Sequence, residues 1–262
     1  MPEGHLIHRY ARDQEQTFAG ALLRVSSPQK RFLEGARHLD GSRLERVEAY
    51  GKHLFYWWEG KEVLHVHLGP QGTFLPVRPG APPLAQARLR ISGPDAGIDL
   101  VAPTVCELLG PEGRDRIVAR LGPDPLRDDA NPDAAFAAIA GSSRMIGALV
   151  LDQAVLAGVG NVLRAEGLFL TGLHPTVRGT SVSRDVFDSL WSHLTLMMRR
   201  AVAEGRIITV RPPGVDVRTI PESEGRYVYK QERCRRCGTP VQTGELAGRT
   251  AYACPRDQPP PS

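Results

Sequence analysis

Residues 155–169 read VLAGVGNVLRAEGLF, and this stretch places a glycine-rich turn directly before an apolar helical segment. Gly158, Gly160 and Asn161 mark the turn. Free backbone N–H groups at a helix N-terminus can bind a phosphate, and glycine lets the phosphate approach closely. Asn161 can add a side-chain donor. Simple helix capping is the competing interpretation, and the stretch alone does not decide between the two.

Helical segments surround this turn. The sequence "PDAAFAAIAG" (132–141) predicts a short helix, "IGALVLDQ" (146–153) a second, and the segment from Ser183 to Gly205 a long amphipathic one. Upstream, "LGPDPLRDDANPD" (121–133) is typical of an interdomain linker, because its prolines and acids interrupt the periodicity. We therefore expect a helical domain over residues 134–224.

The N-terminal part predicts a different architecture. A helix is expected from Glu3 to Phe18, and Gly20 ends it. From Ala21 to about Val105, short runs such as "HLFYWW" and "VLHVHLG" alternate or carry β-branched and aromatic residues, with Gly or Pro between them. Such spacing predicts an antiparallel β-sandwich over residues 1–120.

Two histidines of this region share one strand face. His65 and His67 are two residues apart, so both point to the same side of the expected strand. Such a pair can bind a metal, but no third ligand is evident nearby in the sequence. Packing or hydrogen bonding is therefore the favoured interpretation.

The chain starts with "MPEGHLIHRY", which permits two interpretations. Proline suits the first helical position, and Glu3 suits the positive end of a helix dipole. Alternatively, removal of Met1 makes Pro2 a free secondary amine. An α-amino group has a pKa of about 7.7–8, so part of it is an uncharged nucleophile near neutral pH. These two residues alone favour the structural interpretation.

The C-terminal segment, residues 225–262, carries three of the four cysteines. Cys234 and Cys237 form a Cys-x-x-Cys pair, and Cys254 follows after sixteen residues, with Asp257 where a fourth cysteine would stand. Two such pairs around a hairpin make a tetrahedral zinc site, and zinc also accepts a carboxylate. We expect one structural zinc, held more weakly than by four thiolates. A hairpin that folds without metal is the alternative.

Composition and charge are those of a soluble, globular chain of 262 residues with formal net charge +4. No apolar run approaches a membrane span, and no signal peptide is evident, so a cytoplasmic location is expected. From Gly225 to Ser262 there are seven Lys and Arg against three Asp and Glu, so this segment holds the whole positive excess. A basic segment with clustered cysteines favours a phosphate-backbone partner, although a solvated surface has the same charge.

In this order, "MPEG", "GKHLF", "HLG", "LGPDPL", "LDQAVLAGVGNVLRAEGLF" and "CRRCGTPV…GRTAYACPR" resemble the formamidopyrimidine-DNA glycosylase / endonuclease VIII family over nearly the whole chain. The resemblance implies an α+β multidomain fold: an N-terminal antiparallel β-sandwich with an N-terminal helix, a helix–two-turn–helix domain and a β-hairpin zinc finger. It also implies a base-excision enzyme that removes oxidised bases from damaged double-stranded DNA, acts as a monomer and associates with the nucleoid.

The resemblance assigns roles to matching positions. Pro2 matches the N-terminal nucleophile, and Glu3 matches the adjacent acid. Lys52 in "GKHLF", otherwise an ordinary hairpin lysine, matches the lysine that contacts DNA and assists catalysis. Asn161 matches a residue that grips the phosphates beside the lesion, within the turn of Gly158 and Gly160. Arg249 matches the phosphate-binding arginine of the finger.

Three departures from the family pattern bear on specificity. Asp257 replaces the fourth zinc cysteine, and Pro70 with Gln71 stands where residues fill the gap left by the extruded base. No Arg-Phe-Gly sequence is present where the formamidopyrimidine branch inserts one into the duplex. This favours the endonuclease VIII branch, and hence oxidised pyrimidines, with single-stranded or bubble DNA as an alternative substrate form.

Two other classes compete with a bifunctional glycosylase and β,δ-elimination lyase. A non-catalytic DNA-binding relative is disfavoured by the intact Pro2, Glu3 and Lys52. A tautomerase that uses an N-terminal proline as a general base is disfavoured, because such chains are much shorter and lack a cysteine finger.

Overall fold

The computed structural model describes residues 2–261 and divides the chain into two compact units. The first comprises Ile7–Arg120 and the residues before Gly4, and the second comprises Gly4–Leu6 and the residues from Leu121 onward. None of the helices in the described range is long and apolar enough to cross a membrane.

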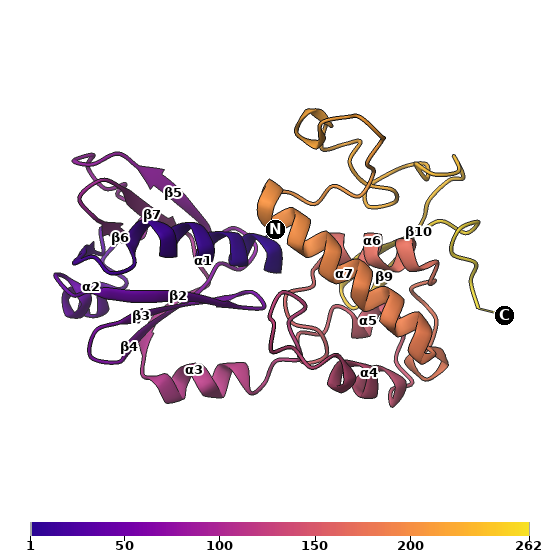
Figure 1. Cartoon of the computed structure of the whole chain (residues 1–262), viewed down its shortest axis with the longest axis horizontal. Helices are drawn as coiled ribbons and strands as arrows, with labels where there is room; N and C mark the ends of the chain where they lie inside the picture. The colour runs from indigo at the N-terminus through magenta and orange to yellow at the C-terminus, as the bar shows by residue number, and fades with distance from the viewer. Residues whose placement is uncertain (1, 262) are drawn as a thin grey trace. The chain divides into compact units, whose positions relative to one another are not determined.

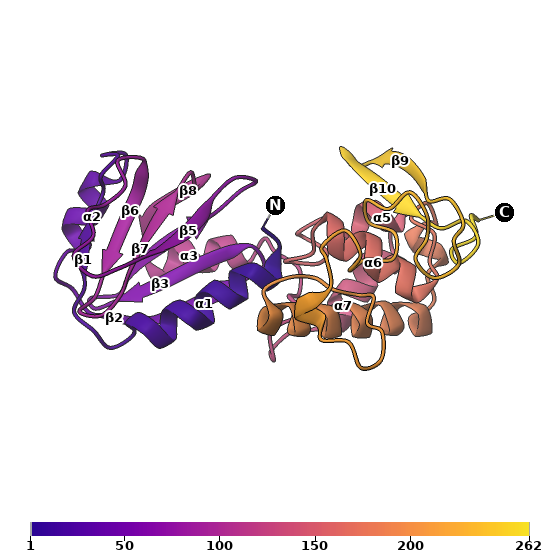
Figure 2. The same ribbon diagram turned by 90° about the horizontal axis from the view of Figure 1, so that it is seen from above.

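Eight strands form two antiparallel sheets in the first unit. The strands are β1 (Arg24–Ser26), β2 (Leu44–Tyr50), β3 (His53–Trp58), β4 (Glu62–His67), β5 (Thr73–Val77), β6 (Ala87–Ser92), β7 (Gly97–Val101) and β8 (Val105–Leu109). One sheet has the order β1-β6-β7-β5 and the other the order β2-β3-β4-β8. The predicted β-sandwich is thus confirmed, and Figure 2 shows its strands from above.

Three helices accompany the sandwich: α1 (Gly4–Phe18), α2 (Leu33–Leu39) and α3 (Pro111–Val118). The apolar side of α1 contributes Ile7 and Phe18 to the core that Leu54 and Leu64 of the sheet also line. The sequence predicts only strands between Ala21 and Val105. This prediction is wrong for Leu33–Leu39, which form α2. Ala36 and Leu39 on α2 are buried three residues apart, which is helical spacing.

The second unit is built mainly from helices, and Figure 1 shows its long helix α7 in orange. The elements are α4 (Pro132–Ala140), α5 (Ile146–Leu149), α6 (Asn161–Thr171), the 3₁₀ turn η1 (Gly179–Ser181), α7 (Arg184–Glu204), the 3₁₀ turn η2 (Val217–Thr219), β9 (Gln242–Leu246) and β10 (Arg249–Ala253). Leu163 and Leu168 of α6 pack with Leu190 and Leu194 of α7 in a buried core.

Helix α5 is shorter than the sequence predicts. It ends at Leu149, whereas the pattern predicts a helix over 146–153. The Asp152 carboxylate accepts a hydrogen bond from the backbone N–H of Ala154 at 3.1 Å. Such local side-chain bonds compete with the helical ladder, so the chain turns here and leads into the glycine-rich stretch.

Candidate functional site

The first described residues, Pro2 and Glu3, precede α1. Glu3 is the N-cap residue in an extended conformation, so Pro2 lies outside the helix. The structural interpretation requires Pro2 at the first helical position and is therefore wrong on this point. Glu3 is 3% exposed, and its side chain makes no capping bond to α1. The carboxylate is thus held at the positive end of a 15-residue helix without capping it. Whether Met1 is removed lies outside the described residues.

Lys52 lies in the two-residue turn that joins β2 and β3. Gly51 precedes it with φ +57°, and a two-residue hairpin loop of type II′ needs glycine at this first position. Tyr50 pairs with His53 directly after the turn. The tight turn therefore presents the half-buried Lys52 at the end of a well-paired hairpin.

Pro70 and Gln71 are exposed in the turn between β4 and β5. The ends of this turn are tied together, because the backbone N–H of Gly72 donates to the carbonyl of Leu68 at 3.1 Å. Both side chains are thus available to a ligand, but no contact in the structure tests their predicted role in filling the gap in DNA.

Gly158 and Gly160 form the predicted turn before α6. Gly160 is the N-cap residue and Asn161 the first helical residue. The backbone of Gly158 has φ +87°, and its carbonyl accepts a hydrogen bond from the N–H of Gly4 at 2.8 Å. Glycine is required at position 158 because other residues rarely adopt this φ.

Asn161 is connected to the β9–β10 hairpin. Its amide Nδ2 donates to the carbonyl of Thr250 at 3.1 Å, and its Oδ1 accepts from Arg164 at 2.5 Å. Arg249, the neighbour of Thr250, is exposed at the start of β10. The second unit thus brings two of the predicted DNA-binding residues, Asn161 and Arg249, to one place.

Arg164 is a residue that the sequence reasoning missed. It is 1% exposed, and its guanidinium donates to the carbonyls of Gly147, Leu246 and Thr250 at 3.3, 3.2 and 2.9 Å. It therefore fastens both ends of the hairpin turn to α6. The sequence feature that could have indicated Arg164 is its position three residues after Asn161, because side chains at this spacing on a helix are neighbours.

Glu166 is the second missed residue, and its carboxylate is fully buried. It accepts backbone N–H bonds from Tyr227, Val228 and Tyr229 at 2.8, 2.9 and 2.9 Å and a bond from the Thr209 hydroxyl. The bonds fix the segment that leads into the cysteine cluster.

Cys234, Cys237, Cys254 and Asp257 come together as the spacing predicts, with ligand atoms all within 4.8 Å of one another. The Asp257 Oδ2 lies 3.3 Å from the sulfurs of both Cys234 and Cys254. Burial raises the pKa of Cys234 to about 12, so a metal that binds its thiolate has to displace a proton. Three sulfurs and one carboxylate oxygen at this spacing fit one tetrahedral zinc ion.

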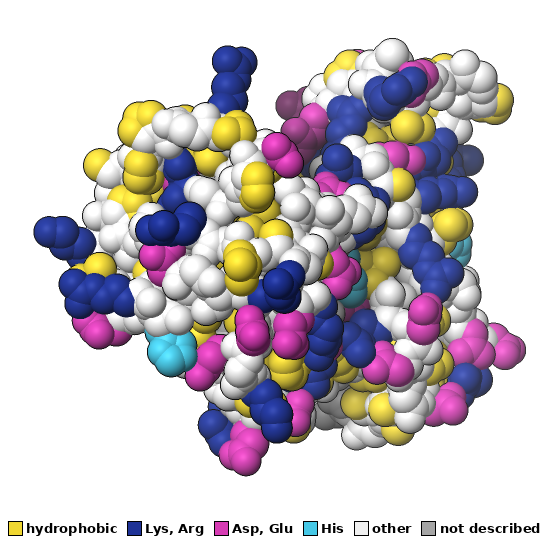
Figure 3. Space-filling view, turned by 60° about the vertical axis from the view of Figure 1, so that its left-hand side comes forward, with side chains coloured by type: hydrophobic (Ala, Val, Ile, Leu, Met, Phe, Trp, Pro, Cys, Tyr) yellow, Lys and Arg dark blue, Asp and Glu magenta, His cyan; other side chains and the backbone are white. Residues whose placement is uncertain are grey.

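On the face drawn in Figure 3, charge alone does not mark a DNA site. Figure 3 shows Lys and Arg side chains in several groups, with Asp and Glu side chains between them. Arg236 of the cysteine segment lies over aromatic rings, 4.4 Å from the centroid of Phe169 and 5.1 Å from that of Tyr227. Part of the positive charge of this segment is thus engaged in packing.

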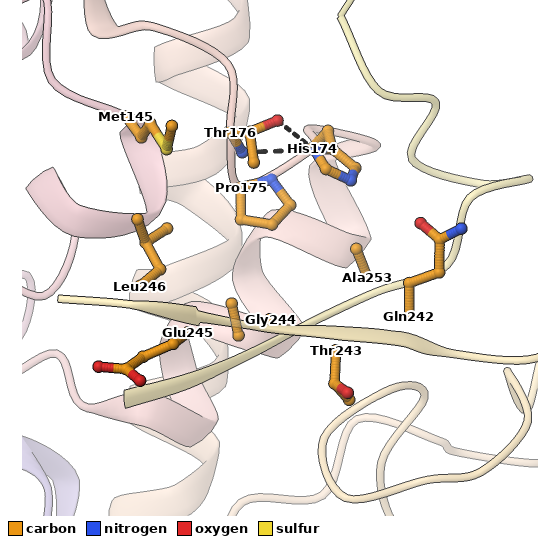
Figure 4. Close-up of a pocket in the computed structure, with 11 residues that line it drawn as sticks. Met145, His174, Pro175, Thr176, Gln242, Thr243, Gly244, Glu245, Leu246 and Ala253 are labelled. Carbon is orange, nitrogen blue, oxygen red and sulfur yellow. Dashed lines mark hydrogen bonds between the residues drawn. The ribbon is translucent and has the colours of Figure 1, made fainter. Parts of the chain in front are cut away.

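A cavity of about 290 Å³ lies between the β9–β10 hairpin and residues 174–176 of the second unit (Figure 4). Met145, Pro175 and Leu246 make much of its wall apolar, and the His174 ring bonds to Thr176 at 2.7 Å. Its lining includes none of the described residues predicted to bind DNA or metal, so this cavity is separate from those sites.

Comparison with known proteins agrees with this architecture. The family model of the formamidopyrimidine-DNA glycosylase N-terminal domain matches residues 1–100, and that of the H2TH domain matches residues 121–211. Endonuclease 8 1 of Mycobacterium tuberculosis (strain H37Rv) is 45% identical, covering 97% of this chain and 98% of its own. The formamidopyrimidine-DNA glycosylase of Synechococcus elongatus is 30% identical, covering 94% and 89%.

Solved structures share the fold. Lactococcus lactis Fpg in complex with DNA containing an abasic site has a TM-score of 0.81 at 20% identity, covering 98% of this chain and 99% of that one. MutM in complex with DNA containing carbocyclic 8-oxo-G has a TM-score of 0.82 at 20% identity. The two family models and the 45% identity to endonuclease 8 1 define a DNA glycosylase of DNA repair. The chain belongs to the formamidopyrimidine-DNA glycosylase / endonuclease VIII family.

Proposed function

We propose that the protein is a bifunctional glycosylase and abasic-site lyase that removes oxidised pyrimidines from damaged double-stranded DNA. The observation that carries the proposal is the buried Glu3 directly before α1, next to Pro2, in a chain of this family. The higher identity to endonuclease 8 1 (45%) than to the formamidopyrimidine-DNA glycosylase (30%) supports the preference for pyrimidines.

Chemistry on a base requires that the base first leave the helical stack. The Pro2 nitrogen then attacks C1′ of the sugar, the bond to the base breaks, and the base leaves with the bonding electrons. Glu3 supplies the proton that opens the sugar ring. The resulting iminium ion withdraws electrons, so a 2′ proton is lost and the 3′ phosphate leaves by β-elimination. A second elimination releases the 5′ phosphate and leaves a one-nucleotide gap.

The remaining predicted residues act on the DNA backbone. Lys52 and Arg249 neutralise phosphate charge, and Asn161 with the turn of Gly158 and Gly160 binds phosphates beside the lesion. Pro70 and Gln71 fill the gap left by the extruded base. One zinc ion at the cysteine cluster holds the hairpin that carries Arg249. We further propose that the protein acts as a monomer in the cytoplasm, associated with the nucleoid.

Borohydride trapping on a duplex with one abasic site tests the nucleophile. The reagent reduces the iminium ion, so we expect a covalent protein–DNA product whose cross-linked peptide begins at Pro2. In a control protein with an uncleaved N-terminal extension, the Pro2 nitrogen is part of a peptide bond, so this protein should not be trapped through Pro2. Full trapping of protein that retains Met1 would refute the assignment of Pro2.

Glu3→Gln separates the two reactions. Removal of a damaged base needs the proton from Glu3, whereas the sugar of a pre-formed abasic site already opens spontaneously. We therefore expect the variant to lose base removal and to keep part of its strand cleavage. Equal loss of both activities would assign Glu3 a structural role. A panel of duplexes, each with one defined lesion, in double-stranded, single-stranded and bubble form, tests the substrate preference.

A further inference from the structure

A polar line crosses three strands of the sheet β2-β3-β4-β8, on the face opposite the sandwich core. His65 on β4 lies between Phe55 on β3 and Glu107 on β8 in the strand register. The Nδ1 atom of His65 lies 2.9 Å from the Glu107 Oε1, and its Nε2 lies 2.9 Å from the Nδ1 of His53. The rings of His53 and His65 are stacked, with centroids 5.1 Å apart. The line thus ends at His53, the residue that directly follows Lys52.

The hydrogen bonds of this line have one direction. An ionised carboxylate only accepts, so the Nδ1 of His65 carries the proton shared with Glu107. Burial lowers the pKa of His65, and its ring is therefore neutral near pH 7 with a bare Nε2. His53 must then donate from Nδ1, and its own Nε2 stays bare. Glu107 therefore sets the tautomer of both rings.

A third ring in contact with His53 has the opposite tautomer. The His67 ring centroid is 4.8 Å from that of His53. The Nδ1 atom of His67 accepts a hydrogen bond from the backbone N–H of Gly69 at 3.2 Å, so a neutral His67 carries its proton on Nε2. The structure thus assigns different tautomers to neighbouring rings of one cluster.

The cluster is electrostatically coupled to Lys52. Burial, followed by the charges of His67, His65 and Lys52, lowers the pKa of His53 to about 3. The pKa of His67 is lowered by burial and then by His65 and Lys52. A proton on the ring of His53 or His67 would repel the ammonium group of Lys52, whereas a neutral ring would not.

We propose that Glu107, His65 and His53 are positioning residues for Lys52: the hydrogen-bonded relay fixes the tautomer and the orientation of the His53 ring at the start of β3, directly after the turn that presents Lys52 to the DNA phosphate. The proposal rests on the proposed function in taking Lys52 as a DNA-contacting group. Metal binding fits this cluster less well. Among the described residues, the group of three or more His, Cys, Asp and Glu side chains placed to hold a metal ion is the cysteine cluster, and the histidine cluster is not such a group.

Ring ¹⁵N NMR of the full chain at pH 7 tests the relay without DNA. We expect His53 and His65 to carry the proton on Nδ1 and His67 on Nε2. Glu107→Gln introduces an amide that can donate as well as accept, so His53 and His65 should shift toward the Nε2–H form. Glu62→Gln is the matched control, since Glu62 on β4 pairs at 3.2 Å with the exposed His38 outside this line. An Nε2–H tautomer of His53 in the unaltered protein would overturn the relay.

A double-mutant cycle tests the connection to Lys52. We measure the Kd for a duplex with an uncleavable abasic-site analogue. Glu107→Gln and His65→Phe should each weaken binding, up to about tenfold, because a misplaced group loses much of its effect. In a Lys52→Met background they should cause no further loss, since the relay acts through Lys52. Additive losses would refute the positioning role and indicate general destabilisation.

The two proposals fail in different ways. Absence of a trapped product and of strand cleavage in the unaltered protein would refute the proposed lyase activity, whatever the ring tautomers are. Proton positions on His53 and His65 other than Nδ1, or additive losses of DNA affinity, would refute the relay in a protein that traps DNA normally.

Discussion

Glu166→Gln should loosen the segment that connects the helical part of the second unit to its cysteine cluster. The carboxylate is fully buried and accepts three backbone N–H bonds and one hydroxyl bond. The amide has one acceptor oxygen, and its NH₂ group must face donors. The less costly orientation places NH₂ toward Thr209, whose hydroxyl also lies 3.2 Å from the Gly225 carbonyl and can reorient.

The magnitude follows from the bonds that remain. In this orientation the Tyr227 N–H loses its acceptor, which costs about 1–3 kcal/mol. The bonds from Val228 and Tyr229 change from charge-assisted to neutral and lose about 1 kcal/mol each. Relief from burying a charge offsets part of this sum. We expect a net local destabilisation of about 3 kcal/mol, which lowers amide protection by about 100-fold.

Hydrogen exchange of the amides of residues 227–229 measures this loss directly. Glu204→Gln is the control, because Glu204 pairs with Arg211 at 2.7 Å and accepts no comparable set of backbone bonds in the described structure. This variant should change exchange of the same amides by less than about 1 kcal/mol. Unchanged protection at residues 227–229 in Glu166→Gln would refute the view that the carboxylate anchors this segment.

Three further predictions concern other parts of the chain. Gly4→Ala should lower the melting temperature, because a Cβ there would lie 2.8 Å from the Gly158 Cα, a backbone atom that cannot move aside cheaply; a melting temperature equal to that of the unaltered protein would contradict this. The pKa of His53 is about 3 in the folded chain, against an ordinary value of 6.5 for an exposed histidine, so its stabilising contribution is complete above pH 6.5 and is lost as the pH falls toward 3. Urea unfolding should therefore show about 2 kcal/mol less stability from this group at pH 5 than at pH 7, a difference absent in His53→Phe. Chelator should remove zinc more easily from the unaltered protein than from Asp257→Cys, because a carboxylate binds zinc more weakly than a thiolate; elemental analysis that finds equal retention would exclude Asp257 as a ligand.

The sequence predicted the elements whose hydrophobic pattern is clean. The helix from Gly4 to Phe18, the sandwich strands and the long helix Arg184–Glu204 follow from periodicity and from capping at Ser183, whose hydroxyl accepts from the N–H of Val186. The spacing of the cysteines predicted a cluster that the structure confirms. Helix α2 was missed because it is short and lies among strand-like runs.

The two buried charges of α6 could not be predicted in the same way. Arg and Glu are usually exposed, so a helix pattern assigns Arg164 and Glu166 to its solvent side. Both are 1% exposed or less, and most of their hydrogen-bond partners are backbone groups far along the chain. Apart from Asn161, which is bonded to Arg164, partners such as Gly147, Thr209, Tyr227 and Thr250 lie 17 to 86 residues away. No local pattern contains such contacts. From the sequence, only His65 and His67 could be placed on one strand face. The strand register brings His53 and Glu107 to His65, and the sequence does not show that register.

Helix α6 therefore connects three features that the sequence presents separately. Its first residue, Asn161, follows the glycine-rich turn, Arg164 binds both ends of the hairpin turn that precedes Arg249, and Glu166 binds the segment leading to Cys234. Arg164 and Glu166 are two positions apart, so they leave the helix on different sides and reach different partners. The hairpin thus has two independent supports, the guanidinium at its turn and the cysteine cluster at its base. Loss of zinc alone should then leave the contact between Arg164 and the hairpin turn in place, and the effect on Arg249 should be smaller than the effect on the base of the hairpin.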